Sequence, residues 1–345
     1  MQPLPVRSFQ PRPTERPAFL ITIDTEGDNA WSRPQRITTE NSRFLPRFQS
    51  LCERYSLKPT YLTNHEMANC PAFREFAKDV VQRGTGEVGM HLHAWDSPPL
   101  TPLTANDLHH HPFLIEYPES VMREKVHALT ELLEQVFAVK MTSHRAGRWS
   151  FDARYARILV AHGYRVDCSV TPHVSWKATK GDPGQGGGTD YRLFPELPYF
   201  LDSNDISRAG ESSLLEVPVT ILDLTPAWFR RLGLAAGSLP SRIVNRLRPA
   251  SAWLRPRGGN LAVMRALLKR AQAERRPCVE FMLHSSEFMP GGSPTFPNEP
   301  AIEALYEDLE TLFSDAGHGF TGQTLTEFHA RIAPEKECRI SSVER

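Results

Sequence analysis

The sequence predicts an α/β protein built as a parallel (β/α) barrel. Short apolar runs alternate with amphipathic stretches along most of the chain, which is the pattern of parallel strands joined by helical crossovers. Several apolar runs end in acidic residues or histidines, as barrel strands do at the face that carries the site. The length of 345 residues suits one such barrel with insertions.

The first half of the chain contains five expected strands. The run AFLITID, residues 18–24, is apolar and ends in an acidic residue, as a buried parallel strand does. A helix over 41–55 is indicated by apolar residues on one face, namely Phe44, Leu45, Phe48 and Leu51. A helix over 72–83 stops near Gly84. The same alternation predicts strands over 59–64, 87–93, 141–147 and 164–170, and helices over 119–137 and 151–163.

The alternation breaks at Thr171 and resumes further on. Residues 173–210 contain the stretch GDPGQGGGTD and little periodicity, which predicts a long loop. Residues 224–258 are rich in Arg and Pro and are expected to form a second insertion. Strands are expected over 213–220 and 277–284 and helices over 261–275 and 299–316, before the stretch LTEFHARI closes the chain.

The chain is expected to form one barrel domain over residues 17–333, interrupted by insertions at about 173–210 and 224–258. Residues 1–16 are rich in Pro and Arg and are interpreted as a disordered arm, and residues 334–345 as a C-terminal tail.

Composition excludes several classes of protein. The 40 basic and 40 acidic side chains balance, so neither nucleic acid nor an anionic membrane is an expected partner. The five cysteines form no C-x-x-C pair and are interpreted as buried reduced thiols. No apolar run approaches the ~20 residues of a transmembrane helix. The start of the chain lacks the apolar stretch of a secretory signal, so a cytoplasmic location is expected.

Polar residues gather at the ends of four expected strands. The first strand ends in Asp24 and Glu26, the third in His91 and His93, and the others in the groups Ser143-His144-Arg145 and His284. Because the carboxyl ends of parallel strands meet at one face of a barrel, these side chains are expected to lie close together.

The H-x-H and D-x-E spacings suit a metal-dependent hydrolase. Residues two apart on a strand project to the same side, so His91 and His93 can reach one ion, which a carboxylate from the first strand would complete. One carboxylate can bind the metal while the other accepts a proton from water. The alternatives are histidines that hydrogen-bond within a loop and an acidic helix cap.

Taken in order, these segments resemble the five motifs of the polysaccharide deacetylase superfamily, also known as the NodB-homology or carbohydrate esterase family four group. ITIDTEGD stands where the family has T-F-D-D-G, GTGEVGMHLHAW resembles the second motif, and HRAGRW, VDCSVTP and MLHSSE resemble the remaining three. The resemblance extends from Phe19 to Phe328. It implies a distorted (β/α)7–8 barrel of the glycoside hydrolase and deacetylase type.

The resemblance also implies roles for the matched residues. Asp24 would be the general base and His284 the general acid, while Glu26 and His91 would bind the metal. Arg145 would hold the base carboxylate, and Asp167 would orient a partner, with His284 as the candidate.

Two positions depart from the family pattern. The family's second metal histidine lies four residues after the first, where this chain has Trp95, so the role is assigned to His93. The second acidic residue of the first motif is replaced by Thr25 or Glu26, and Asp28 is a competing ligand.

The implied activity is a metal-dependent hydrolysis that removes an N-acyl group from an amino sugar or glycan, with acetyl as the expected acyl group. A lipid-linked or nucleotide-linked glycan precursor is the expected substrate for a cytoplasmic enzyme. Zn²⁺ is the expected ion, with Co²⁺, Mn²⁺ and Ni²⁺ as alternatives. Other readings are a deformylase or another hydrolase of non-peptide C–N bonds from the same superfamily, a retaining glycosidase on a related barrel, and a non-catalytic glycan-binding protein.

Overall fold

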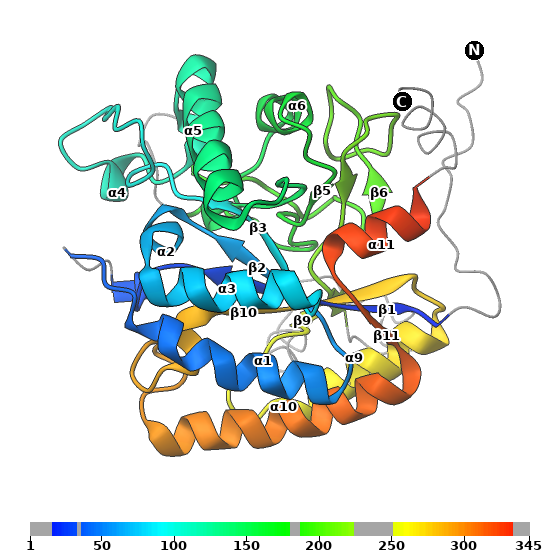
Figure 1. The fold of residues 1–345 in the computed structure, drawn as a ribbon. Coiled ribbons are helices and arrows are strands. Elements are labelled where there is room, and N and C mark those ends of the chain that lie inside the picture. Colours follow the sequence, from blue (N-terminus) through cyan, green and yellow to red (C-terminus); the bar gives the residue numbers. More distant parts are fainter. Residues whose placement is uncertain (1–15, 33–35, 180–186, 224–250, 334–345) are drawn as a thin grey trace, which may run out of the picture.

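A single large sheet forms the centre of the protein (Figure 1). The computed structural model describes residues 16–32, 36–179, 187–223 and 251–333. Within these residues the sheet has nine strands in the order β10–β1–β2–β3–β4–β5–β7–β6, and β11 pairs with β1 off this path. All pairings in it are parallel except the antiparallel β6–β7 pair.

The strands are short and unequal in length. Those of the large sheet are β1 (Ala18–Thr25), β2 (Pro59–Thr63), β3 (Glu87–Leu92), β4 (Ser143–Ala146), β5 (Val166–Asp167), β6 (Tyr199–Phe200), β7 (Leu215–Glu216), β10 (Cys278–His284) and β11 (Thr321–Gln323). A separate antiparallel pair consists of β8 (Ile221–Asp223) and β9 (Ser251–Trp253).

Helices alternate with the strands as expected up to β5 and again from residue 261 onward, and no described helix lies between β5 and β8. The α-helices are α1 (Leu45–Arg54), α2 (His65–Asn69), α3 (Pro71–Arg83), α4 (Asp107–His110), α5 (Glu119–Phe137), α6 (Ala153–Ala161), α9 (Leu261–Ala273), α10 (Glu299–Gly319) and α11 (Leu325–Ile332). Short 3-10 turns are η1 (Ala30–Ser32), η2 (Glu40–Phe44), η3 (Leu114–Glu116), η4 (Gly147–Trp149) and η5 (Ser285–Phe288).

The predicted elements are largely confirmed. The strands expected over 164–170 and 213–220 are found, but each pairs over only two residues as β5 and β7. The first part of the helix expected over 41–55 is the 3-10 turn η2. The short strand β11 and the β8–β9 pair were not expected. The predicted arm before residue 16, the tail after 333 and most of the insertion at 224–258 lie outside the described residues.

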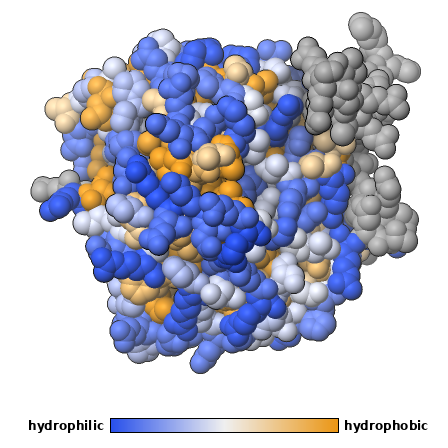
Figure 2. All heavy atoms as spheres, viewed as in Figure 1, coloured by the Kyte–Doolittle hydropathy of each residue, from blue (hydrophilic) through white to orange (hydrophobic). Residues whose placement is uncertain are grey.

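The two faces of the sheet bury different residues. Alternate residues of β1, including Phe19, Ile21 and Ile23, belong to the larger apolar core, in which the surrounding helices pack. The opposite face of the same strand contributes Ala18 and Leu20 to a second core. The outer faces of α1, α3 and α10 are toward the viewer in Figure 2 and are largely hydrophilic.

The second core shows that the sheet curls on itself. It joins Leu20 of β1, Val166 of β5, Leu215 of β7 and Cys278 of β10. In a flat sheet, β5 and β7 would lie too far from β1 and β10 for these residues to form one core. Two apolar residues of α11, Leu325 and Phe328, belong to the same core. This end of the barrel is therefore closed by packing, and the polar strand ends lie at the other end, where the loops follow the strands.

Two smaller expectations concern cysteines and membrane segments. Cys52, Cys70, Cys168 and Cys278 are buried with free thiols, as expected, and Cys338 lies outside the described residues. Among the described helices, none combines the length and the apolar character that a bilayer span requires.

Candidate metal centre

The predicted site residues lie at the carboxyl ends of five strands of the sheet, β1, β3, β4, β5 and β10. In the register of β1 and β10, Asp24 is the partner of His284, and in the register of β3 and β4, His91 is the partner of Arg145. Thr22, Asp24 and Glu26 alternate along the first strand and so share one face, the one that lines the barrel. The sheet therefore brings together side chains that are far apart in sequence: Asp24 and His284 are separated by 260 positions.

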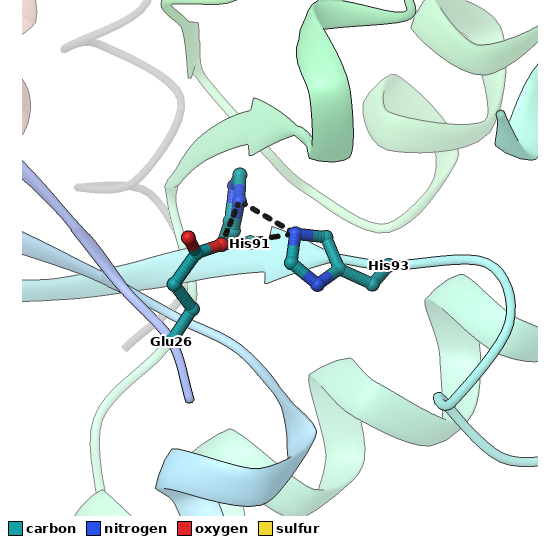
Figure 3. Close-up of side chains that lie close together, drawn as sticks. All are labelled: Glu26, His91 and His93. Carbon is teal, nitrogen blue, oxygen red and sulfur yellow. Dashed lines mark hydrogen bonds and ion pairs between the residues drawn. The ribbon is translucent and has the colours of Figure 1, made fainter. Parts of the chain in front are cut away.

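Glu26, His91 and His93 point toward one another (Figure 3). The Nε2 atoms of the two histidines are 3.2 Å apart, and the Oε2 atom of Glu26 lies 3.5 Å from the first and 3.1 Å from the second. An ion with bonds of about 2.1 Å holds neighbouring ligand atoms about 3.0–3.4 Å apart in octahedral or tetrahedral geometry. The three donor atoms therefore fit one divalent ion without rearrangement.

The surroundings fix each of these three ligands. The Nδ1 atom of His91 lies 3.0 Å from the carbonyl oxygen of Arg145, the kind of contact that orients a metal-binding imidazole. The ring of His93 stacks on Trp95 with centroids 4.4 Å apart, so this tryptophan supports the orientation of the His93 ring. The main chain of Glu26 is held by Ser285, whose hydroxyl is 3.2 Å from its nitrogen and 3.1 Å from its oxygen.

The electrostatics favour a carboxylate at this point. Burial raises the pKa of Glu26, but the hydrogen bonds from His91 and His93 outweigh it and hold that pKa well below its usual range. Burial lowers the pKa of His93, but the hydrogen bond and charge of Glu26 raise it to about 9. The three side chains are 6 % or less exposed, so the carboxylate and the two imidazoles interact with little screening by water.

Asp24 is the second carboxylate of this strand, and Arg145 holds it. The Nη1 atom of Arg145 is 2.5 Å from Oδ1 of Asp24, and Nη2 contacts both Glu280 and Thr22. Burial raises the pKa of Asp24, but the positive charges of Arg145, His91 and His284 outweigh this effect. The pKa of Asp24 is therefore below its usual value. The guanidinium uses one side of the Asp24 carboxylate and leaves Oδ2 directed toward the site.

His284 faces both carboxylates. Its Nε2 atom lies 3.7 Å from Oδ2 of Asp24 and 4.0 Å from Oε1 of Glu26. Behind the ring, Oε2 of Glu287 is 3.1 Å from Nδ1 and also accepts the main-chain N–H of His284 at 2.8 Å. The distances of 3.7 and 4.0 Å are longer than hydrogen bonds, so Nε2 of His284 is not hydrogen-bonded to either carboxylate.

Two residues near His284 were not predicted as site residues. The guanidinium of Arg255 donates to both oxygens of Glu287, at 3.0 and 2.9 Å. The ring of Trp31 meets that of His284 edge-on with centroids 4.8 Å apart, and Trp31 is 40 % exposed. Sequence patterns gave no signal for either, because neither lies at the end of an expected strand: Trp31 belongs to η1, and Arg255 follows β9, which was not expected. Arg242, Arg246 and Arg248 of the same Arg-rich segment lie outside the described residues.

The expected contact between Asp167 and His284 is not found. Oδ1 of Asp167 lies 2.6 Å from Nδ1 of His144, whose Nε2 is 2.8 Å from the hydroxyl of Tyr155. Asp167 ends β5, which β2, β3 and β4 separate from β1, whereas β10 lies on the other side of β1, and this separation is the reason for the error. The partner of His284 is instead Glu287.

The competing ligands of the first motif are occupied elsewhere. The carboxylate of Asp28 accepts the main-chain N–H groups of Glu40 and Asn41, each at 2.9 Å, and so caps η2. The hydroxyl of Thr25 donates to the carbonyl of Ile23 at 2.9 Å. Glu26 is thus the residue of this motif whose carboxylate reaches the two histidines.

Solved structures with a similar fold support this architecture. No protein-family model matches the sequence, and no curated protein matches it significantly. A polysaccharide deacetylase from Mycobacterium smegmatis superposes with a TM-score of 0.53 at 14% identity, covering 95% of each chain. A glycoside hydrolase/deacetylase from Parabacteroides distasonis gives 0.58 at 10% identity, covering 92% of this chain and 70% of that one.

A third structure widens the comparison beyond deacetylases. A GH57 branching enzyme from Thermococcus kodakaraensis gives a TM-score of 0.51 at 10% identity, covering 92% of this chain and 72% of that one. At these identities the likeness concerns the course of the backbone, and the distorted barrel that the motifs imply is confirmed. The chain has the fold of the polysaccharide deacetylases.

Proposed function

We propose that this protein is a metal-dependent hydrolase that removes an N-acyl group from an amino sugar, or from a glycan that contains an amino sugar. Acetyl is the expected acyl group. The observation that carries the proposal is the close approach of Glu26, His91 and His93, whose donor atoms are 3.1–3.5 Å apart beside a second carboxylate and a further histidine. Glu26, His91 and His93 would hold the ion, with Zn²⁺ as the expected metal.

The chain's own residues have separable duties in this reaction. When bound, a divalent cation supplies Lewis acidity for a carbonyl oxygen and for water. Asp24, held on one side by Arg145, is placed to accept the proton of the attacking water at its Oδ2 atom. His284 then delivers a proton from Nε2 to the departing nitrogen, and Glu287 holds the ring in place through Nδ1. The products are a free amine and a carboxylate.

The fold and one exposed ring support the proposed substrate class. Two of the structures similar in fold are described as deacetylases. Trp31 stands exposed against His284, where an aromatic face can stack on a sugar ring. We propose an amino sugar or glycan, free or linked to a nucleotide or lipid, and a divalent metal as the cofactor. A deformylase or another hydrolase of non-peptide C–N bonds is the second candidate, since the same groups would act on any accessible amide.

Acetate release and metal content test the proposal together. The full chain loaded with Zn²⁺ should release acetate and free amine from N-acetylated amino sugar oligomers. Asp24→Asn should lower the rate by at least ~10²-fold, the smaller contribution typical of a general base, and keep its zinc. His91→Ala should lose both. Formate release from N-formyl sugars without acetate release would favour the second candidate, and Asp24→Asn with full activity would refute the assigned base.

A further inference from the structure

A second group of metal-ligand residues lies next to the candidate metal centre. Glu66, from the first turn of α2, and Asp96, from the loop after β3, each place a carboxylate oxygen within 4.8 Å of the other and of a ring nitrogen of His93. They line a cavity of ≈ 40 Å³ together with Gly27 and Asp28. A water molecule needs only about 10–15 Å³ of such space, so the cavity can hold an ion together with water.

The carboxylates in this cavity have oxygens without partners. Among the described residues, no other residue gives a hydrogen bond to either oxygen of Asp96 or to Oε2 of Glu66, although all three atoms are buried. Oε1 of Glu66 is engaged, because it accepts the main-chain N–H of Gly27 at 3.1 Å and a second hydrogen bond from the side chain of Asn64. The contacts of Oε1 leave Oε2 free for a ligand, and buried oxygens of this kind are rare without one.

No neighbouring lysine or arginine accounts for these oxygens. The nearby ammonium group of Lys125 donates to the carbonyls of Ser97 and Pro99 at 2.6 and 2.7 Å and forms no ion pair among the described residues. Among the described residues, no lysine or arginine therefore pairs with either carboxylate, although the two lie within 4.8 Å of each other.

We propose that Glu66, Asp96 and His93 bind a second divalent cation beside the candidate metal centre. A mixture of carboxylate oxygens and an imidazole nitrogen suits Zn²⁺ or Mn²⁺ better than Ca²⁺, which prefers oxygen ligands alone. The remaining positions would be filled by water from the cavity. Such an ion neutralises both carboxylates and joins the segments that follow β2 and β3.

The second site shares one residue with the first but otherwise stands apart from it. His93 belongs to both groups and would bind one ion through each ring nitrogen, with the ring N–H proton released to solvent. Glu26 and His91 belong only to the first group, and Glu66 and Asp96 only to the second. The proposal does not require that the protein be a deacetylase. Substitution of the unshared residues therefore tests each site separately.

The test is the zinc content of the full chain after removal of metal by chelation, reloading with Zn²⁺ and dialysis. The unaltered protein should hold two equivalents, and Glu66→Gln and Asp96→Asn should hold one each. His91→Ala should also hold one equivalent, but at the other site, and His93→Ala should bind less than either. Asp28→Asn is the matched control: it lines the same cavity, its oxygens already have partners, and it should keep both ions. Thermal unfolding shows whether each variant is folded.

The outcomes separate the two sites. One equivalent that survives Glu66→Gln and Asp96→Asn but not His91→Ala would overturn the second site and leave the first. One equivalent that survives His91→Ala but not Asp96→Asn would support the second site and overturn the metal assignment behind the proposed function. An unaltered protein that holds no zinc overturns both. Anomalous scattering at the zinc edge would place each ion against its ligands.

Discussion

His284 depends on a charged pair that lies behind its ring. Oε2 of Glu287 accepts from both the main chain and Nδ1 of His284, and Arg255 holds the same carboxylate from the other side. Burial raises the pKa of Glu287, but the charge of Arg255 and the hydrogen bond from His284 outweigh it and lower that pKa. Glu287 is thus an ionised group that orients His284 while remaining out of reach of a substrate.

Replacing this carboxylate should weaken catalysis without weakening substrate binding. We expect Glu287→Gln to lower kcat by about 10–100-fold, the usual effect of removing the partner that orients a site histidine, with KM nearly unchanged. Steady-state kinetics on an N-acetylated amino sugar, with zinc content measured in parallel, would show this split. A rise in KM at constant kcat would instead mean that Glu287 contributes to substrate binding.

Similar reasoning explains which residues of the site could be predicted. Asp24, Glu26, His91 and His93 follow from two spacings, because a period of two places alternate residues of a strand on one face. The partner of Asp167 could not be predicted, since the choice between His144 and His284 depends on the order of strands around the barrel.

At the scale of elements, the close approach of β3 and the turn after β4 determines where His93 points. Gly147 begins η4, and a Cβ atom added there would overlap the carbonyl oxygen of Leu92 and lie 2.6 Å from Cδ2 of His93. Only a glycine lets the two segments come this close. The small residue therefore belongs to the architecture of the metal centre although it offers no ligand.

Gly147→Ala should displace His93 and weaken metal binding. Forcing a methyl group into a well-packed region typically costs about 1–3 kcal/mol, so we expect a lower free energy of unfolding and a lower zinc content. Gly317→Ala is the control. Gly317 lies in α10, and a Cβ atom added there would come no closer than 3.9 Å to a neighbouring atom, the carbonyl oxygen of Tyr55. This control should be neutral or slightly stabilising. Chemical denaturation and zinc analysis of both variants would decide, and equal behaviour of the two would contradict the argument.

At the scale of the whole molecule, the barrel contains buried charged groups between its apolar floor and its site. Arg145 of β4 is fully buried and contacts Asp24 and Glu280, and on the neighbouring strands β5 and β7 Asp167 lies against Glu216. Burial and the charge of Asp167 raise the pKa of Glu216 well above its usual value. Asp167 is ionised, because burial is outweighed by its hydrogen bond with His144 and its pKa is lowered.

The raised pKa of Glu216 makes stability depend on pH. The folded protein holds a proton on Glu216 at pH values where the unfolded chain releases it, so stability falls as pH rises above ~4.3, the usual pKa of Glu. This loss amounts to at most about 1.4 kcal/mol per pH unit and continues up to the pKa of the folded state. Glu216→Gln keeps a neutral acceptor for the main-chain N–H of Val170 and should flatten this slope.

Denaturant unfolding of both proteins at several pH values between 5 and 8 would measure the two slopes. We expect the unaltered protein to lose stability relative to Glu216→Gln as pH rises through this window. Parallel curves would mean that Glu216 is charged in the folded protein and that its proton is not the source of the dependence.

The amino-acid sequence by itself determined the alternation of strands and helices, the parallel sheet and the polar ends of its strands. These follow from local periodicity and from the rule that parallel strands end on the same side. Only the tertiary structure decided that Glu287 and Arg255 support His284, that Trp31 stands over it, and that Glu66 and Asp96 meet at His93. Such contacts depend on how far the sheet curls and on where its loops return, and neither is encoded in the spacing of residues along one segment.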